Sequence, residues 1–139
     1  MNTNDILLPV AAQLLLIAIT AILTVLTRRR AALAGKIKFN RFKTMDLSGI
    51  EDKYVTPGNN YNNQFQIPML FLAFVLFAMQ LQLIDTFFVA ASWAFVVTRY
   101  CHTLIHLTTN HVVHRLLSFA LGLVIIFTCW FRLIWLALG

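Results

Sequence analysis

The sequence predicts an all-α integral membrane protein whose four spans form an up-down helical bundle. Of its 139 residues, 60% are hydrophobic and only 12% are charged, whereas a soluble domain has about 45–50% and about 25%. Four apolar stretches approach or exceed the length needed to cross a hydrocarbon core of about 30 Å. Short connections place neighbouring spans antiparallel. We expect one domain, residues 1–139, with spans at about 6–27, 57–83, 86–107 and 115–138.

Each span is justified by its own residues. In the first, a run of Leu, Ile, Val and Ala precedes the basic cluster 28–30, the reverse of a signal peptide, so we expect it to be retained. In the second, Thr56 and Pro57 are typical of an N-cap and first helical residue, and Pro68 predicts a kink. The third follows a predicted polar turn at residues 82–86. The fourth continues from Arg115 to Leu138.

The basic residues predict the orientation. Eight of the eleven Lys and Arg residues lie between the first two spans: Arg28, Arg29, Arg30, Lys36, Lys38, Arg41, Lys43 and Lys53. Cytoplasmic loops carry this excess. We therefore expect the first and third loops in the cytoplasm and both termini on the other side of the plasma membrane, or of the inner membrane in a bacterium. The net charge of +6 is then explained by the orientation in the membrane. We expect membrane lipids as partners and no nucleic acid.

Two polar stripes interrupt the apolar helices. At 100° per residue, Arg99, His102 and His106 share one face of the third span. Asn59, Asn63 and Gln66 share a face at the start of the second helix. Both stripes lie toward the predicted cytoplasmic edge, as does Arg115. Guanidinium, imidazole and amide groups at one level of a bundle predict a pocket for a polar, anionic ligand.

Simpler interpretations stay open for the same residues. The third-span stripe is also compatible with a structural network, Arg115 with the interfacial start of a span, and the three amides with interhelical hydrogen bonds. The cluster 28–30 is typical of an anchor for lipid head groups. His102 and His106 have the i, i+4 spacing of metal ligands, but no acidic or thiolate partner lies near them in the sequence. We expect no metal site.

The residues resemble the MAPEG family, the membrane-associated proteins in eicosanoid and glutathione metabolism. Its third-span pattern is Arg-x-x-His-x-x-x-Tyr, followed nine residues later by Arg. Arg99, His102 and Arg115 match this pattern, with His106 in the place of Tyr. A second motif of the family is Arg-x-x-x-Asn-x-x-Glu. Here Asn63 matches its Asn, while Asn59 and Gln66 stand where the family has Arg and Glu.

The resemblance implies a homotrimer that binds glutathione between subunits near the cytoplasmic face. It makes Arg115 the catalytic residue that stabilises the thiolate, and it implies a set of ligand-binding residues: Asn59, Asn63, Gln66, Arg99, His102 and His106. The implied activity is that of a glutathione-dependent transferase or peroxidase on lipophilic electrophiles or lipid hydroperoxides. The alternative is a non-catalytic protein of the same fold that binds lipid or a partner. Asn59 and Gln66 favour it, because neutral amides form weaker hydrogen bonds to charged groups.

Overall fold

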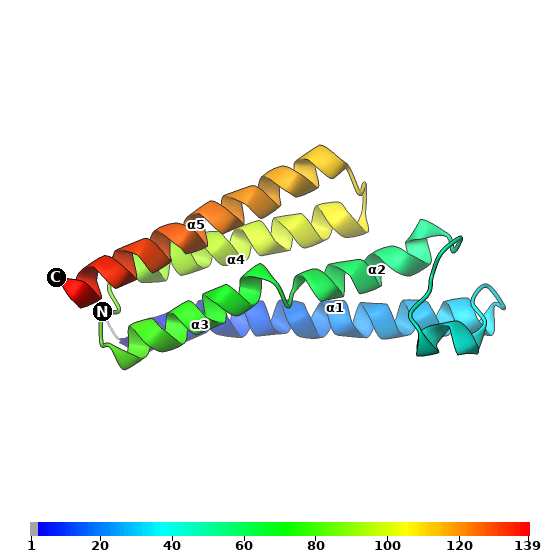
Figure 1. Cartoon of the computed structure of the whole chain (residues 1–139), viewed down its shortest axis with the longest axis horizontal. Helices are drawn as coiled ribbons and strands as arrows, with labels where there is room; N and C mark the ends of the chain where they lie inside the picture. Colours follow the sequence, from blue (N-terminus) through cyan, green and yellow to red (C-terminus); the bar gives the residue numbers. More distant parts are fainter. Residues whose placement is uncertain (1–2) are drawn as a thin grey trace.

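The computed structural model describes residues 3–139, and helices make up its regular structure (Figure 1). The elements are the 3-10 helices η1 (Thr3–Ile6) and η2 (Phe39–Lys43), and the α-helices α1 (Leu7–Leu33), α2 (Asp52–Asn63), α3 (Ile67–Gln80), α4 (Thr86–Leu107) and α5 (Val112–Leu138). Four segments are long and apolar enough to cross a membrane: Asn4–Leu33, Asp52–Gln80, Thr86–Leu107 and Val112–Leu138. The predicted all-α bundle with four spans is confirmed.

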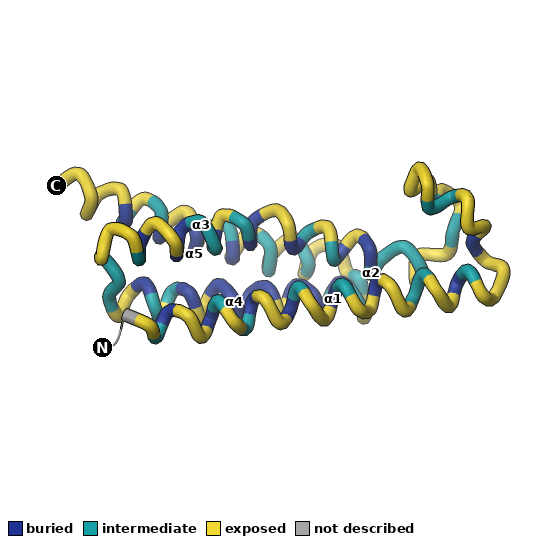
Figure 2. The backbone as a smooth tube through the Cα atoms, turned by 90° about the horizontal axis from the view of Figure 1, so that it is seen from below, coloured by how far each residue is buried: buried dark blue, intermediate teal, exposed yellow. Residues whose placement is uncertain are grey.

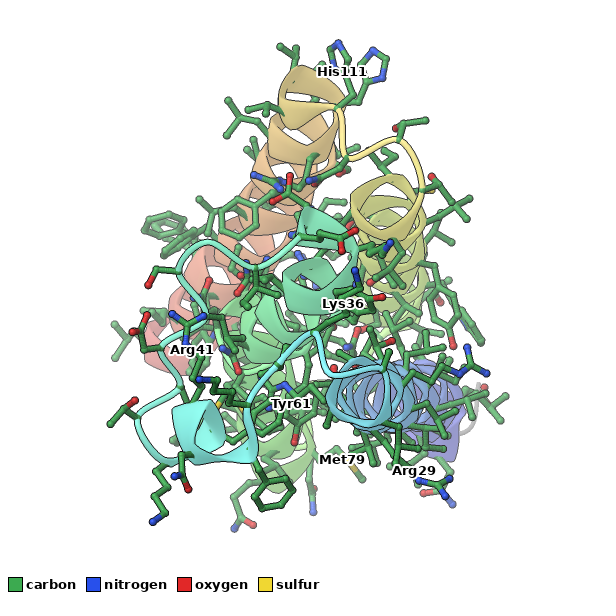
Figure 3. All side chains as sticks on the ribbon, turned by 90° about the vertical axis from the view of Figure 1, so that its right-hand side faces the viewer. Arg29, Lys36, Arg41, Tyr61, Met79 and His111 are labelled. Carbon is green, nitrogen blue, oxygen red and sulfur yellow. The ribbon has the colours of Figure 1, made fainter. Side chains whose placement is uncertain are left out.

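The four spans run antiparallel in sequence order (Figure 1). We call one end of the bundle the basic end; it holds residues 34–51 and the α4–α5 turn at residues 108–111. The opposite end holds both termini and the α3–α4 turn at residues 81–85. Figure 3 looks onto the basic end, with Lys36 and Arg41 on the long connection and His111 at the tip of the short turn. Which end faces the cytoplasm stays a prediction.

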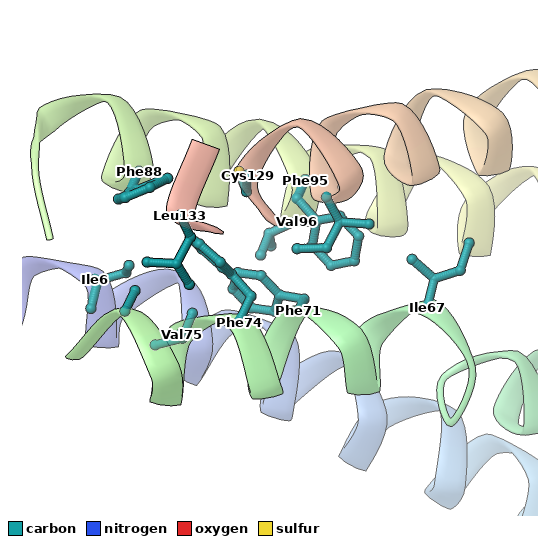
Figure 4. Close-up of a cluster of buried hydrophobic side chains, with 12 residues drawn as sticks. Ile6, Ile67, Phe71, Phe74, Val75, Phe88, Phe95, Val96, Cys129 and Leu133 are labelled. Carbon is teal, nitrogen blue, oxygen red and sulfur yellow. The ribbon is translucent and has the colours of Figure 1, made fainter. Parts of the chain in front are cut away.

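An aromatic core fills the half of the bundle toward the opposite end (Figure 4). Phe71 stacks on Phe95 with ring centroids 4.8 Å apart, and Phe74 meets Phe88 edge-on at 5.1 Å. All four rings are fully buried. Exposed residues run along the outward faces of the helices (Figure 2), and many of them are large and apolar. Inside a membrane such a core stabilises the bundle through close packing, because lipid is as apolar as the side chains.

Two predicted helix starts differ from the observed ones. The second helix begins at Asp52, so the prediction of Thr56 as N-cap and Pro57 as first helical residue is wrong. Pro57 is instead the sixth residue of α2. Its fixed φ suits a helix, and the acceptor that it leaves unpaired is the carbonyl of the exposed Lys53. The fourth helix begins at Val112, three residues before Arg115, and α1 runs six residues past Thr27.

The second span is broken, so the prediction of a continuous helix kinked at Pro68 is also wrong. Helix α2 ends at Asn63 and α3 begins at Ile67. Pro68 falls in the first turn of α3, where a helix does not need the missing N–H group. The irregular residues 64–66 therefore connect two helices at membrane depth, where freed backbone groups need partners inside the protein.

Buried side chains hold this break in place. Gln64 is fully buried, and its Nε2 donates to Asn60 Oδ1 and to Thr103 Oγ1, each at 3.2 Å. Gln13 of α1 donates through Nε2 to Gln64 Oε1, also at 3.2 Å. Thr103 Oγ1 donates to Asn60 Oδ1 at 3.3 Å. Residues of α1, α2 and α4 thus meet at Gln64, and this network fixes the position from which Asn63 and Gln66 project.

Candidate functional site

A hollow of about 450 Å³ lies between α2, α4 and α5 toward the basic end. We call it the polar hollow, and it is lined by Asn59, Asn63, Gln66, His102, His106, Val112, Arg115, Leu116 and Phe119. Six of the seven predicted site residues are among these nine. The two stripes come together because residues three and four apart share a helix face, and α2 lies against α4. A larger groove between α1 and η2, of about 650 Å³, is mainly apolar.

Arg99, the seventh predicted residue, lies behind the wall of the polar hollow. Its side chain is fully buried, and its guanidinium carbon is 5.9 Å from the ring centroid of Phe119. None of its three nitrogens has a hydrogen-bond partner within residues 3–139. Taking a guanidinium out of water without a counter-charge costs several kcal/mol. The position therefore suits an arginine that pairs with an anion from outside the chain.

Arg115 lies in the first turn of α5 and points toward α4. Its Nη1 donates to Asn110 Oδ1 at 2.8 Å and contacts His106 Nε2 at 3.3 Å. A guanidinium has no acceptor, so His106 must accept through Nε2, which assigns its ring proton to Nδ1. That Nδ1 is buried and has no partner among the described residues. Arg115 and His106 thus meet from two helices across the rim of the hollow.

His102 joins α4 to the same turn of α5. Its Nδ1 lies 3.1 Å from the carbonyl oxygen of Arg115, and a carbonyl can only accept, so Nδ1 carries the proton. Ser118 Oγ donates to the same carbonyl at 2.9 Å. His102 Nε2 has no partner within the described part of the chain. The ring is therefore oriented by its Nδ1, and Nε2 keeps a free lone pair that is able to accept a hydrogen bond.

Three contributing residues were absent from the predicted site. Asn110 takes a left-handed conformation, with φ of 49°, in the turn after α4, and its side chain reaches back to Arg115. Because α4 ends at Leu107, Asn110 does not continue the helical face of Arg99, His102 and His106. Asn is among the residues that tolerate this conformation, which is a usable signal for a turn. Ser118 and Phe119 lie three and four residues after Arg115, so they share its helix face.

The polar hollow does not present a set of metal-ligating side chains among the described residues. In residues 3–139 no three His, Cys, Asp or Glu side chains are placed to hold a metal ion. Both cysteines, Cys101 and Cys129, are free thiols. The groups that do converge are an arginine, imidazoles and amides, which suit the anionic groups of a ligand.

Comparison with known proteins identifies the family. The model of the MAPEG family matches residues 6–135, nearly the whole chain. The chain belongs to the MAPEG family. No curated protein and no solved structure matches it. As a MAPEG protein with four spans, it is an integral, multi-pass membrane protein whose family includes glutathione-dependent transferases and peroxidases. The homotrimer, the sidedness of the loops and the particular membrane stay predictions.

Proposed function

We propose that this MAPEG protein is a membrane-embedded, glutathione-dependent transferase or peroxidase that acts on lipophilic electrophiles or lipid hydroperoxides. The observation that carries the proposal is the convergence of Arg115, His102 and His106 on one polar hollow, with Arg99 buried behind it. Unpartnered nitrogens on Arg99 and on both imidazoles suit a ligand that supplies acceptors and a donor.

In this proposal Arg115 stabilises the thiolate of glutathione. A free thiol has a pKa of about 8.5, and a neighbouring cation makes the thiolate available near neutral pH. In a transfer reaction the thiolate sulfur attacks the electrophilic carbon, and the leaving group departs with the electron pair of its bond. In a peroxidase reaction the thiolate sulfur attacks the terminal oxygen of the hydroperoxide, so that an S–O bond forms while the O–O bond breaks and the lipid alcohol leaves. A second glutathione thiol then attacks the sulfur of the resulting sulfenic acid, which forms the disulfide and releases the oxygen as water.

The outer wall of the polar hollow supports a lipophilic second substrate. Val112 and Leu116 line the hollow and are also exposed on the surface of α5. An apolar rim on a membrane-facing helix admits a substrate that is already dissolved in the lipid. Because the substrate is concentrated in the bilayer by partitioning, the protein does not need a large pocket of its own to bind it. The expected partners are therefore membrane lipids, a lipophilic small molecule and, in a homotrimer, two further copies of the chain.

A second candidate is a non-catalytic membrane protein of the same fold that binds lipid or a partner. Two observations favour it. Asn59 and Gln66 present neutral amides where the family motif has an arginine and a glutamate. Arg115 is also already engaged by Asn110 and His106. Each lost charge-assisted contact is worth about 1.5–3 kcal/mol, so two of them weaken glutathione binding by about a hundredfold or more.

Calorimetric titration of glutathione into the detergent-solubilised protein tests the proposal. We expect binding to the natural chain, at least tenfold weaker binding by Arg115→Ala, and no change in Arg29→Ala, an exposed arginine outside the polar hollow. Absence of heat at millimolar glutathione contradicts the proposal. If binding appears only in the double variant Asn59→Arg, Gln66→Glu, the non-catalytic candidate is correct. The mass of the protein in detergent tests the homotrimer.

A further inference from the structure

The polar hollow has an unbalanced set of charges. Two arginines serve it, Arg115 in its wall and Arg99 behind Phe119. None of its nine lining residues is Asp or Glu. A carboxylate or thiolate therefore finds cations there, whereas an ammonium group finds amide oxygens and two like charges.

The chain has five acidic residues, and their positions keep them from the hollow. Asp5 and Asp85 lie at the opposite end of the bundle, and Asp85 pairs with Arg132. Asp46 and Glu51 belong to the long connection at the basic end, where Glu51 pairs with Lys36 and Lys53. In a second copy of the chain with the same orientation in the membrane, these acidic residues lie at the same heights along the bundle axis, away from the polar hollow.

Asp52 is the acid that comes nearest along α2. It precedes Asn59 by seven residues, which is two helical turns or about 10 Å along the axis. It lines a separate hollow of about 270 Å³ that shares only His106 with the polar hollow. Asp52 is therefore on the far side of His106, and the polar hollow keeps its excess of positive charge.

The excess of positive charge in the hollow affects the binding of glutathione, because glutathione carries an ammonium group beside one of its two carboxylates. Moving an ammonium group out of water without an anionic partner is costly, and amide oxygens compensate it only in part. Gln66 stands where the family motif has a glutamate, the one motif position that offers a carboxylate. In this chain that position supplies a neutral amide.

We infer that the polar hollow recognises its ligand through anionic groups alone, so that a thiol whose amine is acylated or absent binds at least as tightly as glutathione. The inference rests on the proposed function, from which it takes the thiol. It assigns the ligand to a chemical class, dianionic thiols without an ammonium group, and leaves the reaction unchanged.

Titration with two matched ligands tests this inference. Glutathione and its N-acetylated form differ only in the charged amine, so their net charges at neutral pH are −1 and −2. For the natural chain we expect the acetylated form to bind with equal or several-fold higher affinity. If glutathione binds ten times more tightly than the acetylated form, the inference is wrong while the proposed function stands. If neither thiol binds, the proposed function fails, and the inference fails with it.

The variant Gln66→Glu sharpens the test, because it adds a carboxylate at the hollow. We expect the ratio of the two affinities to move toward glutathione by about tenfold or more. Gln80→Glu adds the same charge on an exposed residue at the other end of α3 and is expected to leave the ratio unchanged. An unchanged ratio in Gln66→Glu, with both thiols still bound, contradicts the inference, because the ammonium group is then recognised by other residues.

Discussion

Arg132 and Arg99 lie on facing helices of one bundle in very different surroundings. Arg132, toward the opposite end, donates through Nη2 to Asp85 Oδ2 at 2.6 Å, and its guanidinium carbon is 4.7 Å from the ring centroids of Phe87 and Phe88. About a third of its side chain is exposed. Arg99 is fully buried, and no described residue hydrogen-bonds its guanidinium.

Under the proposed function, this difference separates an arginine that stabilises the fold from one that binds the ligand. The contacts of Arg132 offset its partial desolvation, and they join the start of α4 to the end of α5. The single aromatic contact of Arg99 does not offset complete burial. An anionic ligand that pairs with Arg99 would explain why the chain keeps a buried arginine that lowers the stability of the free protein.

The largest expected effect is that of Arg99→Met, which tests this comparison directly. Methionine fills most of the same volume without a charge, so we expect the unfolding free energy to rise by about 1–4 kcal/mol. Binding of an anionic thiol is expected to fall at least tenfold. Thermal unfolding in detergent and calorimetric titration measure the two effects. A variant that is less stable than the natural chain and binds normally contradicts the assignment of Arg99 to the ligand.

Arg132→Met is expected to have a smaller effect on stability, in the opposite direction. The partly exposed ion pair is worth up to about 1 kcal/mol, and each contact with a phenylalanine ring about 0.5–1 kcal/mol. We therefore expect a loss of about 1–3 kcal/mol and unchanged thiol binding, because the polar hollow lies toward the basic end. The same two measurements apply, and weakened thiol binding shows that the two ends of the bundle are coupled.

The smallest expected effect is the loss of stability at acidic pH that comes from the Asp85–Arg132 ion pair. Burial raises the pKa of Asp85, but the bonds from Arg132 and from the Phe88 N–H outweigh it and hold this pKa below its ordinary value of 3.8. The pair therefore stabilises the fold above that ordinary value, and the contribution is lost as pH falls through the lower, folded-state pKa. Because the carboxylate is more than a third exposed, we expect about 0.5 kcal/mol after screening. The difference in Tm between the natural chain and Asp85→Asn measures it, and a difference that persists below this pKa contradicts the prediction.

Much of the site followed from local rules. Periodicity grouped Asn59 with Asn63, and Arg99 with His102 and His106, because neighbours on a helix face repeat every three or four residues. Arg115 was grouped with them from its membrane level. The break at residues 64–66 did not follow, because it depends on Gln13 and Thr103, which lie far from Gln64 in the sequence.

The number of spans, their approximate ends and the polar face of each helix were determined by the sequence alone, because the length and periodicity of apolar residues are local properties. The tertiary structure decided which faces meet, that Arg115 is held by Asn110 and His106, and that Arg99 is buried without an acid while Arg132 has one. Pairing between charges depends on distances between helices that are far apart in the chain. Those distances are set by the packing of the whole bundle.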